Sequence, residues 1–280
     1  MRFGILYNSS KDPGQKCASA VKNSILRRDQ ELVFYTDLKG LKESRDDIEC
    51  DFLYVLGGDG TILAASRTFA EKNVGIVSIN LGHLGYLSEL DMVDIDSSVE
   101  SILAGDYFVD NRVMLSCSKE DDDYVFTALN DFVLSHASVS RIVDIEISIN
   151  GQPIDHYLCD GMIVCTPTGS TAYSLSAGGP VIAPDASCLL ITPICPHTLS
   201  SKSIVINDHD EVGLRLKSDI NKAVVSGDGV ECFGISKDEV CIIKKSDLFA
   251  RFIRFQERNF FDILKFKLNS NLETDRYYEN

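Results

Sequence analysis

The chain has 280 residues, enough to bury one large core or two moderate ones. A hydrophobic share of 44% and a charged share of 25% indicate a globular protein and exclude general disorder outside the polar end, Asn269 to Asn280. The net charge of −15 argues against a broad nucleic-acid or anionic-membrane surface, because clustered Lys and Arg hold such partners. A small phosphorylated ligand remains compatible, since backbone N–H groups and a few local cations can bind it.

The nine cysteines are odd in number and contain no Cys-x-x-Cys pair. They therefore favour reduced, buried thiols over a disulfide framework or a zinc site, and we predict no protein-only metal site. The apolar run Met1 to Tyr7 is too short for a signal peptide, and no stretch reaches the length of a membrane-spanning helix. We expect a cytoplasmic protein.

Short apolar runs alternate with helix-like segments in the first part of the chain. This alternation predicts a Rossmann-like parallel sheet with helices on its faces. The predicted strands are Phe3 to Tyr7, Leu32 to Tyr35, Phe52 to Leu56 and Val74 to Ile79, and the predicted helices are Gln15 to Arg28 and Thr61 to Glu71.

The pattern changes near Tyr107. Polar and apolar residues alternate from Asp144 to Ile149, which is typical of a half-buried strand, and Asn150-Gly151 is a hairpin turn signal. Further strands are predicted at Tyr124 to Leu134, Gly161 to Cys165, Ser203 to Ile206, Glu211 to Leu216, Ala223 to Val225 and Glu239 to Ile243. We therefore predict an α/β domain at residues 1–110 and a β-rich domain at 111–249. The mixed apolar segment Phe249 to Leu268 is expected to return to the first domain over about residues 250–270, in part as helix.

The first glycine loop, Gly57 to Thr61, reads Gly-Gly-Asp-Gly-Thr and follows the third predicted strand. Ligands of open α/β sheets bind at this carboxyl edge, and glycines let a phosphate approach the backbone N–H groups. The acidic Asp59 is unusual there, because it repels phosphate unless a metal ion or proton transfer compensates. By itself the loop fits equally a phosphate loop or a tight turn in which Asp59 caps the helix.

Other nucleotide-binding signatures are missing. The third glycine of a dinucleotide fingerprint is replaced by Leu63, and no Gly-Lys-Ser/Thr occurs anywhere in the chain. The pair Asp131-Phe132 continues to Val133, so it is not a protein-kinase Asp-Phe-Gly motif.

Two further segments accompany this loop. Asn80 to Leu87 follows the next predicted strand and should lie beside the first loop on the same sheet edge; its His83 either faces solvent or touches a ligand. Asp160 to Pro180 runs from a strand into a stretch dense in Ser, Thr and Gly, with no Lys, Glu or Gln. Such groups suit hydrogen bonding to a nucleobase and a ribose, and Tyr173 could stack on a base or pack beneath it. The alternative is a polar surface loop, which fits less well because apolar residues flank the segment.

Together these segments resemble the NAD kinases. The resemblance covers most of residues 1–250 and rests on Gly57 to Thr61, Asn80 to Leu87, Ala128 to Asp131, and Asp160 to Pro180 continued by Pro196 to Ser200. The first motif is shared with lipid kinases of the diacylglycerol and sphingosine type, whereas the fourth is specific. The resemblance implies a diacylglycerol-kinase-like α/β domain that binds nucleotide and a β-rich domain that binds NAD.

Site residues follow from the resemblance position by position. Asp59 matches the proposed general base that takes the proton of the 2′-hydroxyl of the adenosine ribose, beside Gly60, with Gly57, Gly58 and Thr61 in the phosphate loop. The positions that match NAD contacts are Asn130, Asp131, Arg141, Asp160, Thr171, Ala172, Tyr173, Ser174, Leu175 and Ser176.

The chain departs from the family pattern at four positions. Asp131 stands where glutamate is usual, which moves its carboxylate back by one methylene group. Leu158, Val230 and Ala64 stand where a basic residue, glutamine and arginine are common. The departures leave the proposed base in place and bear on affinity and donor preference.

The implied activity is transfer of the γ-phosphate of ATP, or of a polyphosphate phosphate, to NAD to give NADP. A divalent cation, with Mg²⁺ favoured, should neutralise the donor phosphates. NAD and ATP would be the partners, with no nucleic acid or membrane, in a homodimer or homotetramer. Two alternatives stay open: a lipid kinase, which would need only the first loop, and a non-catalytic NAD(P)-binding protein.

Overall fold

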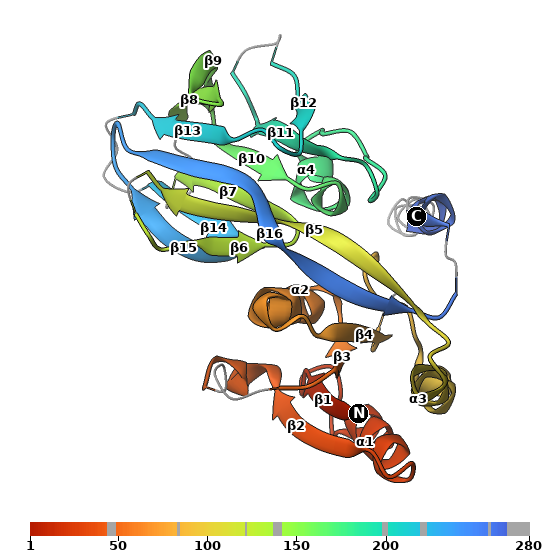
Figure 1. The fold of residues 1–280 in the computed structure, drawn as a ribbon. Helices are drawn as coiled ribbons and strands as arrows, with labels where there is room; N and C mark the ends of the chain where they lie inside the picture. The colour runs from red at the N-terminus through yellow and green to blue at the C-terminus, as the bar shows by residue number, and fades with distance from the viewer. Residues whose placement is uncertain are drawn as a thin grey trace, which may run out of the picture. The chain divides into compact units, whose positions relative to one another are not determined.

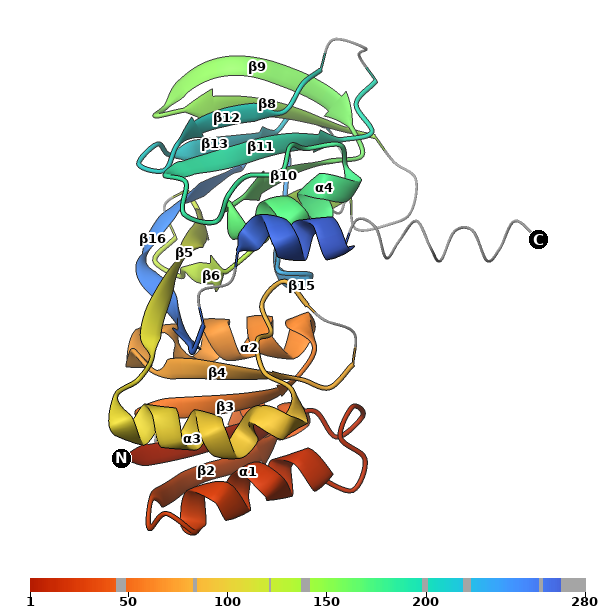
Figure 2. The same ribbon diagram turned by 90° about the vertical axis from the view of Figure 1, so that its right-hand side faces the viewer.

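The computed structural model has two compact units. Unit 1 comprises Met1–Asn111 and Arg251–Asn280, and unit 2 comprises Arg112–Ala250. Figures 1 and 2 show the elements of both units. No helix in the described part of the chain is long and apolar enough to cross a bilayer. The structure describes residues 1–43, 49–82, 85–120, 122–136, 142–197, 201–218, 223–256 and 259–267.

Unit 1 is an α/β unit with a parallel sheet, as predicted. Its strands are β1 Arg2–Tyr7, β2 Glu31–Asp37, β3 Phe52–Gly57 and β4 Gly75–Asn80; its helices are α1 Lys16–Leu26, α2 Asp59–Phe69 and α3 Ile95–Ala104, with 3-10 turns at Leu38–Glu43, Ala70–Lys72 and Met92–Asp94. The strand order is β2-β1-β3-β4, and all neighbours are parallel. The end of β16 (Val240–Arg254) returns to this sheet, where Arg251 and Phe252 pair with Gly75 and Ile76 of β4.

Helices cover both faces of the unit 1 sheet (Figures 1 and 2). Helices α1 and α3 pack on one face in a cluster with β1, β3 and β4, whereas α2 lies on the other. Helix α1 forms because Cys17, Val21 and Ile25 recur on one side at helical spacing and are fully buried. The strands are buried on both faces, so they read as continuous apolar runs.

Unit 2 is β-rich, as predicted, and consists of two packed sheets. Its elements are β5 Phe108–Lys119, β6 Phe126–Ala128, β7 Asp131–His136, β8 Val143–Ile149, β9 Gln152–Cys159, β10 Gly161–Cys165, the 3-10 turn Thr168–Thr171, α4 Tyr173–Ser176, β11 Cys188–Ile194, β12 Ile204–Asn207, β13 Val212–Leu216, β14 Ala223–Gly227, β15 Val230–Ile235 and the first part of β16. One sheet has the order β12-β11-β10-β7-β14-β15, and the other contains β16-β13-β8-β9 with β5 and β6. Alternate residues of both sheets meet in one apolar core.

The hairpin prediction is confirmed. Asn150 and Gly151 connect β8 to β9 with φ values of 52° and 77°. Two successive positive φ values are typical of a type I′ turn, whose backbone twist matches that of the paired strands. The pair Asn-Gly adopts this turn readily. A second turn of this kind, Asp228-Gly229, connects β14 to β15 with φ values of 48° and 76°.

Several expectations about elements were wrong. The strand predicted at Tyr124 to Leu134 is two short strands, because the backbone at Leu129 and Asn130 turns to bind a distant carboxylate. The strand predicted to end at Ile243 continues to Arg254, so the start of the returning segment is strand, and helix occupies 260–267. Helix α3 and strands β5, β9, β11 and β15 were not predicted. The predicted polar end, Asn269 to Asn280, lies outside the described residues.

Candidate functional site

The first glycine loop joins β3 to α2. Gly58 is the N-cap residue of α2 and Asp59 is its first residue, so the alternative in which Asp59 caps the helix is wrong. At Gly57 an added Cβ would lie 2.7 Å from Cβ of Thr61, so only glycine fits. At Gly58 and Gly60 an added Cβ would meet no described atom within 4 Å. The outer side of this loop is therefore open to a ligand.

The carboxylate of Asp59 lies against the second glycine loop. Its Oδ2 accepts a long hydrogen bond of 3.4 Å from the backbone N–H of Tyr86. An added Cβ at Gly85 would lie 2.8 Å from Cγ of Asp59, so a side chain there would displace the carboxylate. The Oδ1 atom is buried and has no hydrogen-bond partner among the described residues. A buried carboxylate oxygen without a donor is costly and needs a ligand hydroxyl or a cation.

The two loops are neighbours on one sheet edge, as predicted. Gly57 pairs with Asn80 in the parallel register of β3 and β4, and the N–H of Leu81 donates to the carbonyl of Gly57 at 3.4 Å. The side chain of Asn80 closes its own loop through hydrogen bonds with Gly82 of 2.9 and 3.2 Å. His83 lies outside the described residues.

In unit 2, Asn130 and Asp131 are held by a carboxylate from a distant turn. Asp228 accepts the N–H groups of Leu129 at 3.0 Å, Asn130 at 2.7 Å and Asp131 at 3.4 Å. Its own N–H donates to the carbonyl of Asp131 at 3.0 Å. This reciprocal set fixes the backbone that presents Asn130. The role of Asp228 was not predicted from the sequence. Asp228-Gly229 is a turn signal, but no neighbouring residue indicates that the Asp228 carboxylate binds the backbone of residues 129–131.

The start of the hydroxyl-rich segment packs on the same backbone. Thr166 donates its N–H to the carbonyl of Asn130 at 2.9 Å and its hydroxyl to the carbonyl of Leu129 at 2.7 Å. The N–H of Gly169 donates to the Thr166 hydroxyl at 3.1 Å. An added Cβ at Gly169 would lie 2.5 Å from the carbonyl carbon of Asn130, so this contact admits glycine alone. Two motifs far apart in sequence thus pack directly against each other.

The remaining predicted residues of unit 2 occupy different positions. Tyr173 is 46% exposed, so its ring is accessible to a ligand. Ser174 is fully buried, with its hydroxyl 2.9 Å from that of Thr192. Exposed Asp160 precedes β10 whereas Thr166 follows it, so the six residue steps between them along the strand separate them by about 20 Å. Thr171, Ala172 and Leu175 are partly exposed and Ser176 is exposed, while Arg141 and the Thr198–Ser200 part of the family motif lie outside the described residues.

Comparison with known proteins identifies the family. Residues 8–107 match the ATP-NAD kinase N-terminal domain and residues 129–255 match the ATP-NAD kinase C-terminal domain. The NAD kinase of Carboxydothermus hydrogenoformans is 44% identical over 232 residues, which cover 82% of each chain. That of Thermoanaerobacter sp. (strain X514) is 37% identical over 279 residues, which cover 95% of this chain and 98% of the relative. The chain belongs to the NAD kinase family.

Solved structures agree with this fold. The NAD kinase from Archaeoglobus fulgidus in complex with ATP has a TM-score of 0.78 at 26% identity, covering 96% of this chain and 99% of that one. Yeast NADH kinase complexed with NADH has a TM-score of 0.79 at 22% identity, covering 95% and 85%, and shows the fold. As a member of the NAD kinase family, the protein is a phosphotransferase whose acceptor is NAD, which decides against the lipid-kinase and non-catalytic alternatives.

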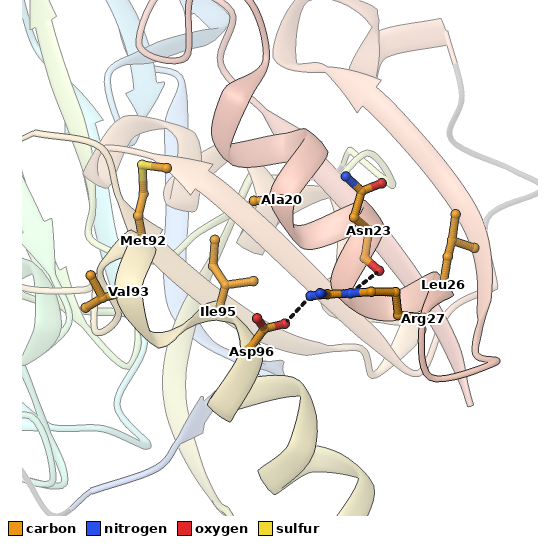
Figure 3. A pocket seen from close by; sticks show the side chains of 8 residues that line it. All are labelled: Ala20, Asn23, Leu26, Arg27, Met92, Val93, Ile95 and Asp96. Carbon is orange, nitrogen blue, oxygen red and sulfur yellow. Dashed lines mark hydrogen bonds and ion pairs between the residues drawn. The ribbon is translucent and has the colours of Figure 1, made fainter.

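One cavity in this NAD kinase family member lies apart from the predicted residues. It has a volume of about 610 Å³ and lies along α1 and the start of α3 (Figure 3). Within it Arg27 binds Asp96 at 2.8 Å. It is lined by Ala20, Asn23, Leu26, Arg27, Met92, Val93, Ile95 and Asp96, none of which belongs to a family motif.

The buried Asp131 is expected to make the stability of this NAD kinase depend on pH. Burial, and then the nearby carboxylate of Asp228, raise the pKa of Asp131 from 3.8 to about 7. The folded state thus binds the proton more tightly than the unfolded state, so the free energy of unfolding falls as pH rises from about 4 to about 7.

Asp131→Asn should remove this pH dependence. From pH 5 to pH 8 the free energy of unfolding of the parent should fall by about 2–3 kcal/mol relative to that of the variant. The reason is that the amide stays neutral at both pH values, whereas the carboxylate of the parent becomes ionised. Urea unfolding of both proteins at the two pH values measures the difference. A constant difference between the proteins would show that Asp131 is ionised throughout.

Proposed function

We propose that Asp59 accepts the proton of the 2′-hydroxyl of the adenosine ribose of NAD while the γ-phosphate of ATP is transferred to that oxygen, giving NADP. The observation that carries the proposal is the buried Oδ1 of Asp59, which lacks a partner among the described residues at the open glycine loop. A hydroxyl donor would satisfy it. General base catalysis needs a carboxylate within hydrogen-bond reach of the reacting proton.

The first glycine loop is proposed to bind the donor phosphates. The outer sides of Gly58 and Gly60 are open, and α2 begins at Asp59, so N–H groups of its first turn are available to anionic oxygens. Transfer of a phosphoryl group depends mainly on such positioning and charge stabilisation. Polyphosphate offers the same oxygens as ATP and remains a second candidate donor.

Unit 2 is proposed to bind NAD. Asn130 and Asp131 are proposed contacts on a backbone fixed by Asp228 and Thr166; the side chain of Asn130 is half-buried and that of Asp131 is buried. Exposed Tyr173 offers a ring on which a base can stack. The other proposed NAD contacts are Arg141, Asp160, Thr171, Ala172, Ser174, Leu175 and Ser176.

A divalent cation fits the loop of unit 1. The Oδ2 of Asp59 accepts only a long hydrogen bond of 3.4 Å, so it can offer a hard oxygen, the ligand type that Mg²⁺ prefers, and Mg²⁺ commonly binds one or two carboxylates together with substrate phosphates. When bound, the ion would neutralise charge on the donor. In the described residues no group of three or more His, Cys, Asp or Glu could hold a metal ion.

A cytoplasmic homodimer or homotetramer completes the proposal. None of the nine cysteines, all at described positions, forms a disulfide, and burial raises the pKa of Cys17 and of Cys50 to about 12, which suits thiols that stay reduced. Strand β9 ends the order of its sheet and exposes Ile154 and Leu158, an edge on which a second subunit could pack. Sedimentation equilibrium measures the assembly.

A matrix of donors and acceptors tests the proposal. With ATP, Mg²⁺ and NAD we expect a product that an NADP-specific dehydrogenase reduces, which reports a 2′-phosphate. Removing the divalent ion with EDTA should abolish product formation, and adding Mg²⁺ back should restore it. Diacylglycerol should not be phosphorylated. A product phosphorylated on NAD but rejected by the dehydrogenase would refute the 2′-hydroxyl assignment.

A further inference from the structure

A buried ion cluster lies at the end of β16 in unit 1. The Nη1 of Arg254 lies 3.0 Å from Oε2 of Glu89, and its Nε lies 3.1 Å from Oδ2 of Asp110. The side chains of Arg254 and Glu89 are only 9% and 3% exposed. We call these three residues the Arg254 cluster. It belongs to none of the family motifs used above.

The cluster holds the chain that follows the second glycine loop. Nη1 of Arg254 also donates to the carbonyl of Leu87 at 3.3 Å, and the hydroxyl of Ser78 in β4 donates to the same carbonyl at 3.0 Å. The N–H of Phe255 donates to Oε1 of Glu89 at 2.9 Å. Leu87 and Glu89 are thus bound from β4 on one side and from the end of β16 on the other.

This held segment leads directly to Asp59. The N–H of Gly85 donates to the hydroxyl of Ser88 at 3.0 Å, which ties Gly85 to the residue between Leu87 and Glu89. The adjacent N–H of Tyr86 donates to the Asp59 carboxylate, and Gly85 lies so close to this carboxylate that an added Cβ would be 2.8 Å from its Cγ. A shift of Leu87 to Glu89 would therefore move the backbone against which the carboxylate rests.

We propose that Arg254 and Glu89 are positioning residues for phosphoryl transfer, which fix the Gly85–Ser88 segment and through it the carboxylate of Asp59. This rests on the proposed role of Asp59 as base. Burying an ion pair is a poor way to gain stability, because desolvation offsets the attraction. A guanidinium that contacts two carboxylates and a carbonyl instead imposes one geometry.

Arg254→Lys tests the proposal, because a lysine keeps the charge but cannot reproduce the guanidinium fork. We expect kcat to fall about 10- to 100-fold, as a small misplacement of a catalytic group does, while KM for NAD changes less than about threefold. Glu89→Gln, which keeps the acceptor for Phe255, should give the same split. The Glu89→Gln variant therefore still tests the proposal if Arg254→Lys fails to fold.

Arg251→Lys is the matched control. Arg251 lies on the same strand end and binds the carbonyl of Asn73 at 2.9 Å, away from the second glycine loop. We expect its kcat to stay within about twofold of the parent. If folded Arg254→Lys and Glu89→Gln lose thermal stability but keep the parent kcat, the cluster is only structural and the inference fails. If instead the Asp59→Asn variant has the kcat of the parent, the proposed role of Asp59 as general base is refuted.

Discussion

Replacing Asp59 by Asn should lower kcat for NADP formation by about 10²- to 10⁴-fold, the usual contribution of a general base. The amide has nearly the same shape, so it can still occupy the space against Gly85, but it cannot take the hydroxyl proton. The NAD contacts proposed in unit 2 are unchanged, so the Kd for NAD should stay within about threefold. Steady-state kinetics and calorimetric titration with NAD measure the two quantities.

Asp37→Asn is a suitable control for this variant. Asp37 ends β2 on the same edge of the unit 1 sheet and accepts the N–H groups of Ser9 and Lys39. Its loss should change kcat by less than about threefold. A folded Asp59→Asn enzyme with near-normal kcat would contradict the general-base role, whatever the control does.

Replacing Gly169 by Ala should have the largest effect on stability. The new Cβ would lie 2.5 Å from the carbonyl carbon and 2.8 Å from Cα of Asn130, both backbone atoms that cannot rotate away. Overpacking of this kind costs about 3 kcal/mol, which lowers the melting temperature by about 10 °C. Because relief requires Asn130 to move, we also expect weaker NAD binding. Calorimetric unfolding and NAD titration check both effects.

Gly58→Ala separates packing from ligand binding. Its added Cβ meets no described atom within 4 Å, and its φ of −103° suits alanine, so the melting temperature should hardly change. The methyl group would occupy space proposed for donor phosphate, so KM for ATP should rise.

Equal melting temperatures for Gly169→Ala and the parent would refute the proposed fit between Gly169 and Asn130.

Local patterns predict much of the fold. The continuous apolar runs of β1, β3 and β4 and the Asn150-Gly151 turn carry their structure in adjacent residues, so the sequence alone indicates them. Helix α3 was missed although it carries a signal too, since Ile95, Val99 and Ile102 have helical spacing and are buried. The long strand β16 was predicted to end at Ile243, because the charged and polar residues that follow interrupt its apolar pattern.

The site is predictable only in part, for a physical reason. Carboxyl ends of adjacent parallel strands share an edge, so the order of strands and loops along the chain is enough to predict that the two glycine loops are neighbours. The carboxylate of Asp228 binds backbone 98 residues away, and Arg254 binds Glu89 across 165 residues. Contacts of this length leave no periodicity in the sequence. The same holds for the close approach of Gly85 to Asp59.

A crystal structure of the protein with NAD, without a phosphoryl donor, tests the central claim most directly. The distance to measure runs from the carboxylate oxygens of Asp59 to the 2′-oxygen of the adenosine ribose. We predict about 2.6–3.2 Å, with the hydroxyl donating to the carboxylate oxygen that lacks a described partner. The account would be contradicted if the 2′-oxygen points away from Asp59, so that either the 3′-oxygen or no ribose oxygen lies within hydrogen-bond distance of the carboxylate.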